Sequence, residues 1–159
     1  MENIIKIKRA LISVSDKSNL KLLLNQLSKY NIETISSGGT FKKISQLGFK
    51  SKEISNFTNI KEMLDGRIKT LNHKIHAGIL NVRSNIKHKN ELKKNNLKEI
   101  DLVIVNFYPF EEKIKKNTFA EIIKNIDIGG PSLVRAAAKN FNDVLVITNP
   151  NYYEKVIKE

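Results

Sequence analysis

The feature that most constrains the fold is an unbroken apolar run near the middle of the chain. Residues 102–105 read Leu-Val-Ile-Val, between Asp101 and Asn106-Phe107. A strand with one solvated face alternates apolar and polar residues, whereas a strand covered on both faces of a parallel sheet is apolar throughout. The segment 101–107 therefore predicts a central parallel strand with helices on both sides of the sheet.

The rest of the chain alternates short apolar runs with segments of helical periodicity. Strands are predicted at residues 9–14, 32–36, 52–54, 101–107 and 144–148. Helices are predicted at residues 17–30, 41–47, 60–64, 74–83, 118–125 and 132–140, and again after Pro150. This alternation indicates β–α–β units, so the predicted fold class is α/β: a doubly wound, mostly parallel sheet with helices on both faces. Because one domain commonly holds about 100–200 residues, residues 1–159 are predicted to form a single domain.

The composition removes several classes of function. The chain has no cysteine, which excludes disulfides, thiolate nucleophiles and Cys-based zinc sites. Its apolar residues never run together for the ~18 positions of a membrane span, and the N-terminus has no signal-peptide core. The predicted location is therefore cytoplasmic, with no membrane partner. His73, His76 and His88 lack a metal-ligand spacing, so no metal site is expected.

The charge points to an anionic partner. Lys and Arg number 28 against 16 Asp and Glu, a net charge of +12. Such a surplus favours a nucleic acid, an anionic membrane surface or a small anionic substrate. The densest basic stretch, residues 87–94, has no aromatic side chain for base stacking, and we interpret it as a solvated surface. No nucleic-acid partner is predicted.

Polar residues follow the first and the central predicted strands, at the edge where doubly wound sheets bind ligands. Ser13, Ser15 and Lys17 alternate there and can direct two hydroxyls and an ammonium toward one anion. The simpler alternative is that Ser15 or Asp16 caps the following helix. The central strand ends in Asn106 and three aromatic residues. These either wall a pocket for a flat heterocycle whose edge Asn106 reads, or plug the edge of the sheet.

The segment Ser37-Gly38-Gly39-Thr40 follows the second predicted strand and precedes a helix. Its two glycines allow the backbone to approach an anion closely. The N–H groups at the helix start and the Thr40 hydroxyl can donate to phosphate oxygens. A structural turn explains the four residues equally well, and they match neither a Walker loop nor a dinucleotide fingerprint.

Two later segments also suit an anionic reaction centre. Arg67 and Lys69 share one face of an extended segment, although an exposed basic loop has the same pattern. Asp127 precedes the pair Gly129-Gly130 and a helix start, where N–H groups can stabilise an oxyanion. Lys139 lies in the last turn of that helix, where a lysine also interacts favourably with the helix dipole.

Taken together, these segments resemble the N-terminal cyclohydrolase domain of the bifunctional purine biosynthesis enzymes, which unite a transformylase with an inosine monophosphate cyclohydrolase. The matching strings are ALISVSDK (10–17), SSGGT (36–40), EMLDGRIKTL (62–71), HAGIL (76–80), NFYPF (106–110) and IDIGGPSLVRAAAKN (126–140). The resemblance implies a methylglyoxal synthase-like fold and a homodimer. It implies ring closure of a formylated carboxamide ribonucleotide, a purine nucleotide precursor, to inosine monophosphate without metal or redox cofactor. The transformylase domain is absent and the chain ends somewhat before a cyclohydrolase domain usually does. We therefore expect either a fragment of a longer protein or a reduced protein, truncated at its C-terminus, whose transformylase is encoded separately.

The resemblance also implies the roles of individual residues. Those that contact the nucleotide are Ser15, Asp16, Lys17, Ser37, Gly38, Gly39, Thr40, Arg67, Ile68, Lys69, Thr70, Val105, Asn106, Asp127 and Ile128. Lys139 is implied as the proton donor and acceptor, with Lys69, Tyr108 and Asp127 lining the reacting face. The chain departs from the family at Asn72-His73, where family members commonly carry His-Pro.

Three other functions fit parts of the pattern. Methylglyoxal synthase needs a carboxylate base after the central strand, where this chain has Asn106. A regulatory module that senses a nucleotide would not need both Asp127 and Lys139. Nucleic-acid binding predicts an affinity that falls steeply with salt.

Overall fold

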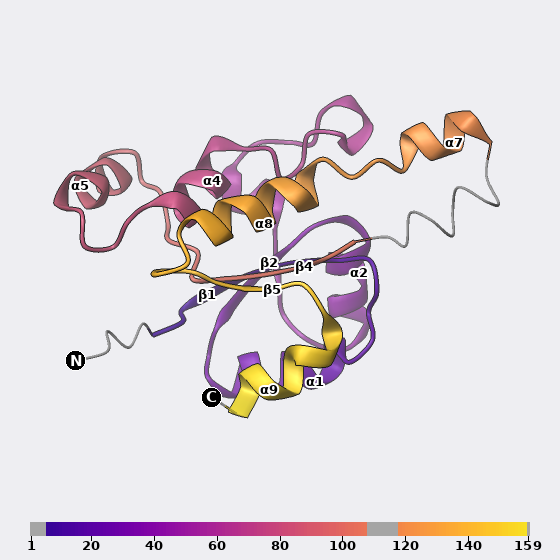
Figure 1. Ribbon diagram of the computed structural model, residues 1–159, viewed down its shortest axis with the longest axis horizontal. Helices are drawn as coiled ribbons and strands as arrows, with labels where there is room; N and C mark the ends of the chain where they lie inside the picture. The colour runs from indigo at the N-terminus through magenta and orange to yellow at the C-terminus, as the bar shows by residue number, and fades with distance from the viewer. Residues whose placement is uncertain (1–5, 108–117, 159) are drawn as a thin grey trace.

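The computed structural model describes residues 6–107 and 118–158 and contains one five-stranded sheet (Figure 1). Its strands are β1 (Arg9–Val14), β2 (Glu33–Ser36), β3 (Lys52–Glu53), β4 (Leu102–Asn106) and β5 (Leu145–Ile147). All pairings are parallel, and the strand order is β3-β2-β1-β4-β5. The predicted class, a doubly wound parallel sheet, is confirmed.

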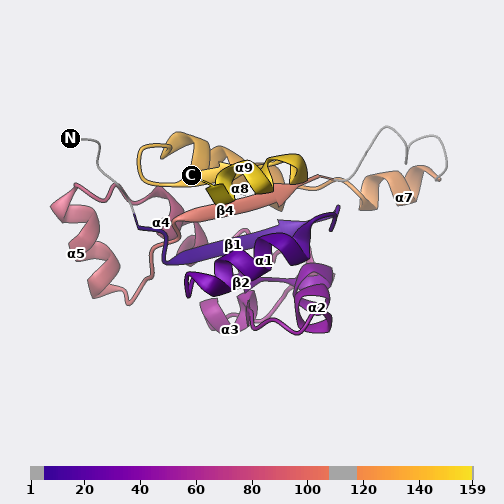
Figure 2. The same ribbon diagram turned by 90° about the horizontal axis from the view of Figure 1, so that it is seen from below.

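Helices cover both faces of this sheet. They are α1 (Leu20–Lys29), α2 (Gly38–Gln46), α3 (Ile54–Thr58), α4 (His73–Leu80), α5 (Ile86–Lys94), α7 (Phe119–Lys124), α8 (Gly129–Lys139) and α9 (Tyr153–Lys158), with 3-10 turns η1 (Leu64–Gly66) and η2 (Pro150–Tyr152). Figures 1 and 2 show α1 and α9 on one face and α4 and α8 on the other, while α7 projects from one end of the molecule. Within the described ranges, no helix is long and apolar enough to cross a membrane.

The position of β4 between β1 and β5, covered on both faces, explains the unbroken apolar run. Successive side chains of a strand point to opposite faces, so each face receives every second residue. Leu102 and Ile104 pack with α1 and Tyr153, whereas Val103 and Val105 pack with α4 and α8. Every residue of β4 is buried. Both faces are covered, and neither set of side chains can be polar without cost.

Several helix boundaries differ from the predictions because side chains stabilise turns there. Helix α1 begins at Leu20 rather than at residue 17, and its N-cap is Asn19 in a left-handed conformation. Asp16 Oδ1 accepts hydrogen bonds from the N–H (2.8 Å) and hydroxyl (2.6 Å) of Ser18, which closes a turn before the helix. Neither Ser15 nor Asp16 is therefore the N-cap.

Both glycine pairs lie inside helices rather than before them. Helix α2 begins at Gly38 and α8 at Gly129, so each pair forms the first turn of its helix. The predicted helix at 60–64 is wrong. The chain instead forms α3 earlier, where the Thr58 hydroxyl bonds to the Ile54 carbonyl at 2.9 Å and Asn59 ends the helix with φ 55°.

Tyr153 makes the stability of the fold sensitive to alkali. Its side chain is 1% exposed in α9, and burial, together with the charge of Asp16, raises its pKa to about 12. The unfolded chain loses this proton near the ordinary value of 10.0, so the stabilisation present below pH 10 is lost as pH rises to 12. We expect the free energy of unfolding to fall by up to about 2–3 kcal/mol over this range. Urea titrations from pH 9 to 12 measure it, and Tyr153→Phe should remove this component. An unchanged slope in that variant would contradict the assignment.

Candidate anion-binding site at the carboxyl edge of the sheet

The strand order places the ends of three strands side by side. β1 lies between β2 and β4, and its register pairs Ile12 with Ser36 and Val14 with Asn106. The order of the sheet reverses at β1, because β4 adds to the side of β1 opposite β2. Doubly wound sheets bind ligands at such a reversal. The segments that follow β1, β2 and β4 thus lie at one edge of the sheet.

Asn106 holds the loop after β1 in place. Its Oδ1 accepts hydrogen bonds from the N–H groups of Ser15 (2.6 Å) and Asp16 (2.9 Å), and its Nδ2 donates to the Asp16 carbonyl at 2.7 Å. The residue is only 8% exposed. Its amide therefore faces the protein backbone, which differs from the predicted role of reading the edge of a heterocycle.

Thr40 connects α2 to the end of β1 by hydrogen bonds. Its hydroxyl accepts from the Val14 N–H at 3.1 Å and donates to the Val14 carbonyl at 3.0 Å, and the residue is 5% exposed. The hydroxyl predicted to bind phosphate is thus used within the fold. The first N–H groups of α2 have no partner inside the helix, and they belong to Gly38 and Gly39 at the edge of the sheet.

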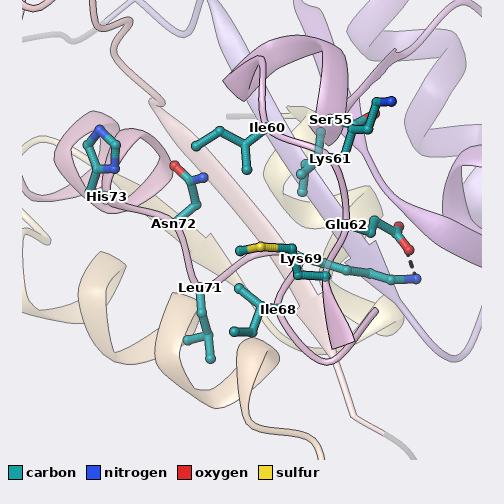
Figure 3. A pocket seen from close by; sticks show the side chains of 11 residues that line it. Ser55, Ile60, Lys61, Glu62, Ile68, Lys69, Leu71, Asn72 and His73 are labelled. Carbon is teal, nitrogen blue, oxygen red and sulfur yellow. Dashed lines mark ion pairs between the residues drawn. The ribbon is translucent and has the colours of Figure 1, made fainter. Parts of the chain in front are cut away.

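Lys69 brings a cation to this helix start. A methyl group built on Gly38 (φ 54°) would lie 3.3 Å from Lys69 Nζ, and one built on Gly66 (φ 82°) would overlap the Lys69 side chain. The ammonium also forms an ion pair with Glu62 at 3.1 Å, drawn as a dashed line in Figure 3. Glu62 was not singled out from the sequence. It lies seven positions before Lys69 in an irregular loop, and such a separation follows neither helical nor strand periodicity. A cation beside free N–H groups at a helix N-terminus is suited to an anion.

The segment before α8 completes the edge. The Gly130 N–H donates to Asp127 Oδ1 at 2.9 Å, so this N–H, predicted to stabilise an oxyanion, is bound to a carboxylate. A methyl group on Gly129 would overlap the Thr70 hydroxyl, and one on Gly130 would lie 3.2 Å from Phe107 Cε1. Asp127 thus sits next to Thr70, the neighbour of Lys69, and next to the end of β4.

The remaining predicted residues lie in four different settings. Ser13 lies within β1 rather than after it, paired with Val105, which is 1% exposed and offers only its backbone. Lys17 Nζ folds back onto the Ser15 carbonyl at 3.1 Å. Residues on the surface or partly exposed at the edge are Ser37, Gly39, Arg67, Ile68 and Ile128. Tyr108 lies outside the described residues.

Lys139 stands apart from this edge within one chain. It is the last of the 11 residues of α8, whose first residue is Gly129. At a rise of 1.5 Å per residue the two Cα atoms are about 15 Å apart, well beyond the reach of a lysine side chain. The structure therefore brings Lys69, Thr70 and Asp127 to one edge and places Lys139 at the far end of α8.

Asp16 keeps a negative charge at the margin of the edge. The hydroxyl and then the N–H of Ser18 lower the pKa of its carboxyl, with a smaller contribution from the charge of Lys17. Because like charges repel, an anion at this edge is favoured near Lys69 and disfavoured near Asp16.

A pocket of about 220 Å³ adjoins this edge beneath the loop that carries Lys69 (Figure 3). It is lined by Ile54, Ser55, Ile60, Lys61, Glu62, Met63, Ile68, Lys69, Leu71, Asn72 and His73. Of the residues predicted for the site, Ile68 and Lys69 line this pocket. The side chain of Lys69 therefore contributes to this pocket and to the start of α2.

Comparison with known families defines the class of this protein. The MGS-like domain matches residues 20–132, more than half of the chain, and the chain therefore belongs to the MGS-like domain family. A solved structure, described as the crystal structure of ForH, superimposes with a TM-score of 0.82 at 29% identity, over 96% of this chain and 78% of that one.

The most informative relatives are proteins named bifunctional purine biosynthesis protein PurH. The protein from Acetivibrio thermocellus is 50% identical over 155 residues, and that from Lactobacillus acidophilus is 52% identical over 154. Each match covers 96% of this chain, which spans about 30% of the length of these relatives. The resemblance found in the sequence blocks is confirmed.

Proposed function

We propose that this chain is an inosine monophosphate cyclohydrolase. The proposal rests on its similarity to PurH over 96% of its length. One observation in the structure carries it: Lys69 lies against the glycine start of α2 and is joined through Thr70 to the Asp127 loop. The substrate is 5-formamidoimidazole-4-carboxamide ribonucleotide. Its carboxamide nitrogen attacks the formyl carbon and a carbon–nitrogen bond forms. The formyl carbon–oxygen bond then breaks, and the oxygen leaves as water with one proton from the carboxamide nitrogen and one from the formamide nitrogen.

The residues at the edge suit the two demands of this reaction. A carboxamide nitrogen is a poor nucleophile, so the rate depends on holding it close to the formyl carbon and on stabilising the oxygen that becomes negative. We assign the phosphate to the first turn of α2 and the developing oxyanion to Lys69. Asp127 would accept a hydrogen bond from the carboxamide N–H and orient it. The family resemblance assigns Tyr108, which lies outside the described residues, to the same reaction.

Lys139 can take part only from a second copy of the chain, since about 15 Å of helix separate it from Gly129. We propose a homodimer in which Lys139 of one copy transfers protons at the candidate site, on the carboxyl edge of the sheet, of the other copy. The Lys69→Met and Lys139→Ala chains should each retain only a small residual activity. When the two are unfolded and refolded as an equal mixture, activity should rise to about a quarter of the wild-type value, because each mixed dimer then holds one intact site. Activity in the mixture no higher than in the separate variants would contradict shared sites.

The proposed activity is tested by following purine formation spectrophotometrically after adding the formylated ribonucleotide to the purified chain. Inosine monophosphate should accumulate without added metal. The same preparation incubated with dihydroxyacetone phosphate should form no methylglyoxal. If inosine monophosphate does not appear while the chain is folded, the proposal fails.

The position of the reaction implies a partner activity. The formyl group must be added before ring closure, so we propose that a transformylase, on the same or on a separate chain, supplies the substrate in the cytoplasm. Under this proposal, residues 1–159 act as one cyclohydrolase domain that needs no cofactor.

A further inference from the structure

A histidine and a serine that the proposed reaction does not use are hydrogen-bonded beside the edge. His76 lies in α4 and Ser132 in the first turns of α8. His76 Nε2 is 2.9 Å from Ser132 Oγ, and His76 Nδ1 is 3.1 Å from the Asn72 carbonyl. A carbonyl only accepts, so in the neutral ring Nδ1 carries the hydrogen and Nε2 accepts the Ser132 hydroxyl. Both side chains are partly buried.

The partners of this imidazole connect the two sides of the candidate site. Asn72 comes two residues after Thr70 and caps α4, since its Oδ1 accepts from the Lys74 N–H at 2.8 Å. Ser132 donates its N–H to the Ile128 carbonyl at 3.3 Å, in the turn that contains Gly129. One ring therefore joins the segment that carries Lys69 to the helix start that holds Asp127, across 56 positions of sequence.

We propose that His76 and Ser132 are positioning residues that hold the Lys69–Thr70 segment in register with the Asp127–Gly130 turn. This inference rests on the proposed cyclohydrolase function. The Thr70 hydroxyl already lies where a methyl group on Gly129 would stand, so the two segments are in close contact. A shift of about 1 Å between the groups that orient nucleophile and electrophile can cost about 10²-fold in rate. The hydrogen-bonded pair restricts that shift.

The inference is tested in the purified chain with Ser132→Ala, Ser132→Thr and His76→Ala. Ser132→Ala and His76→Ala should each lower kcat by about 10-fold or more while KM changes less than threefold, because substrate contacts stay and alignment is lost. Ser132→Thr keeps a hydroxyl and should retain most of the activity. His88→Ala is the matched control: His88 also accepts a hydrogen bond, from the Val82 N–H at 3.0 Å, but at α5. It should leave kcat unchanged.

The double variant His76→Ala/Ser132→Ala should lose no more activity than the worse single variant, since the two residues act as one unit. Losses that multiply would overturn the pairing. Equal kcat values in wild type and Ser132→Ala would overturn the positioning role. It would also be overturned if an unrelated variant with the same melting temperature as Ser132→Ala lost as much kcat. A wild-type chain that forms no inosine monophosphate overturns the proposed function instead, so the two failures are distinguishable.

Discussion

Lys69→Met is expected to lower kcat/KM for ring closure by about 10²–10³-fold, the usual cost of removing one group that stabilises an oxyanion. Lys69 is the cation that lies at the start of α2, with its side chain 30% exposed and its ammonium close to Gly38. Methionine retains the length and apolar stem of lysine, so the wall of the adjoining pocket is preserved while the charge is lost. Steady-state kinetics with the formylated ribonucleotide measure the change.

Lys61→Met provides the matched control for this change. Lys61 lies in the same loop and lines the same pocket, but its exposed side chain is not part of the proposed site. It should retain wild-type kinetics. The melting temperature of Lys69→Met should stay close to that of the wild type, because the ion pair with Glu62 is partly exposed and such pairs contribute about 0–1 kcal/mol. A Lys69→Met chain with wild-type kcat/KM would remove the central assignment.

Asn106→Ala is expected to affect both stability and nucleotide binding. The substitution leaves the N–H groups of Ser15 and Asp16 and the carbonyl of Asp16 without the partner that now binds all three. Unpaired polar groups in a partly buried place cost about 1–3 kcal/mol each when water cannot replace the bond, so we expect a loss of about 2–4 kcal/mol in unfolding free energy. Urea denaturation measures this loss, and calorimetry with inosine monophosphate should show affinity at least 10-fold weaker.

Two further variants serve as controls for Asn106→Ala. Asn106→Asp retains both acceptor interactions and should recover part of the stability, while the added negative charge keeps nucleotide affinity low. Asn95→Ala removes an exposed Asn at the end of α5 whose Nδ2 bonds to the Glu91 carbonyl at 2.8 Å, and it should change stability by less than about 0.5 kcal/mol. If Asn106→Ala were as mild as Asn95→Ala, the loop after β1 would not depend on Asn106.

Much of the architecture could be predicted because it depends on local pattern. The unbroken run at 102–105 required a strand covered on both faces, and the structure covers it with α1 on one side and α8 on the other. The predicted helix at 118–125 was correct to within one residue at each end, because Thr118 and Glu121 form a capping box that is visible as a sequence motif. Helix starts at Gly38 and Gly129 were missed, since glycine is a poor helix former and its place there is decided by close approach of Lys69 and Thr70.

Composition, periodicity and the order of short motifs therefore identified the fold class and the family, because these depend on neighbours along the chain. The same motifs predicted the edge of the sheet at which the candidate site lies. They could not show that the amide of Asn106 is turned toward the loop after β1 or that the hydroxyl of Thr40 is turned toward Val14 at the end of β1. Nor could they show that Glu62 pairs with Lys69 or that His76 meets Ser132. These relations join residues distant in sequence, and only the packing of helices against the sheet sets which polar groups have a partner within hydrogen-bonding distance.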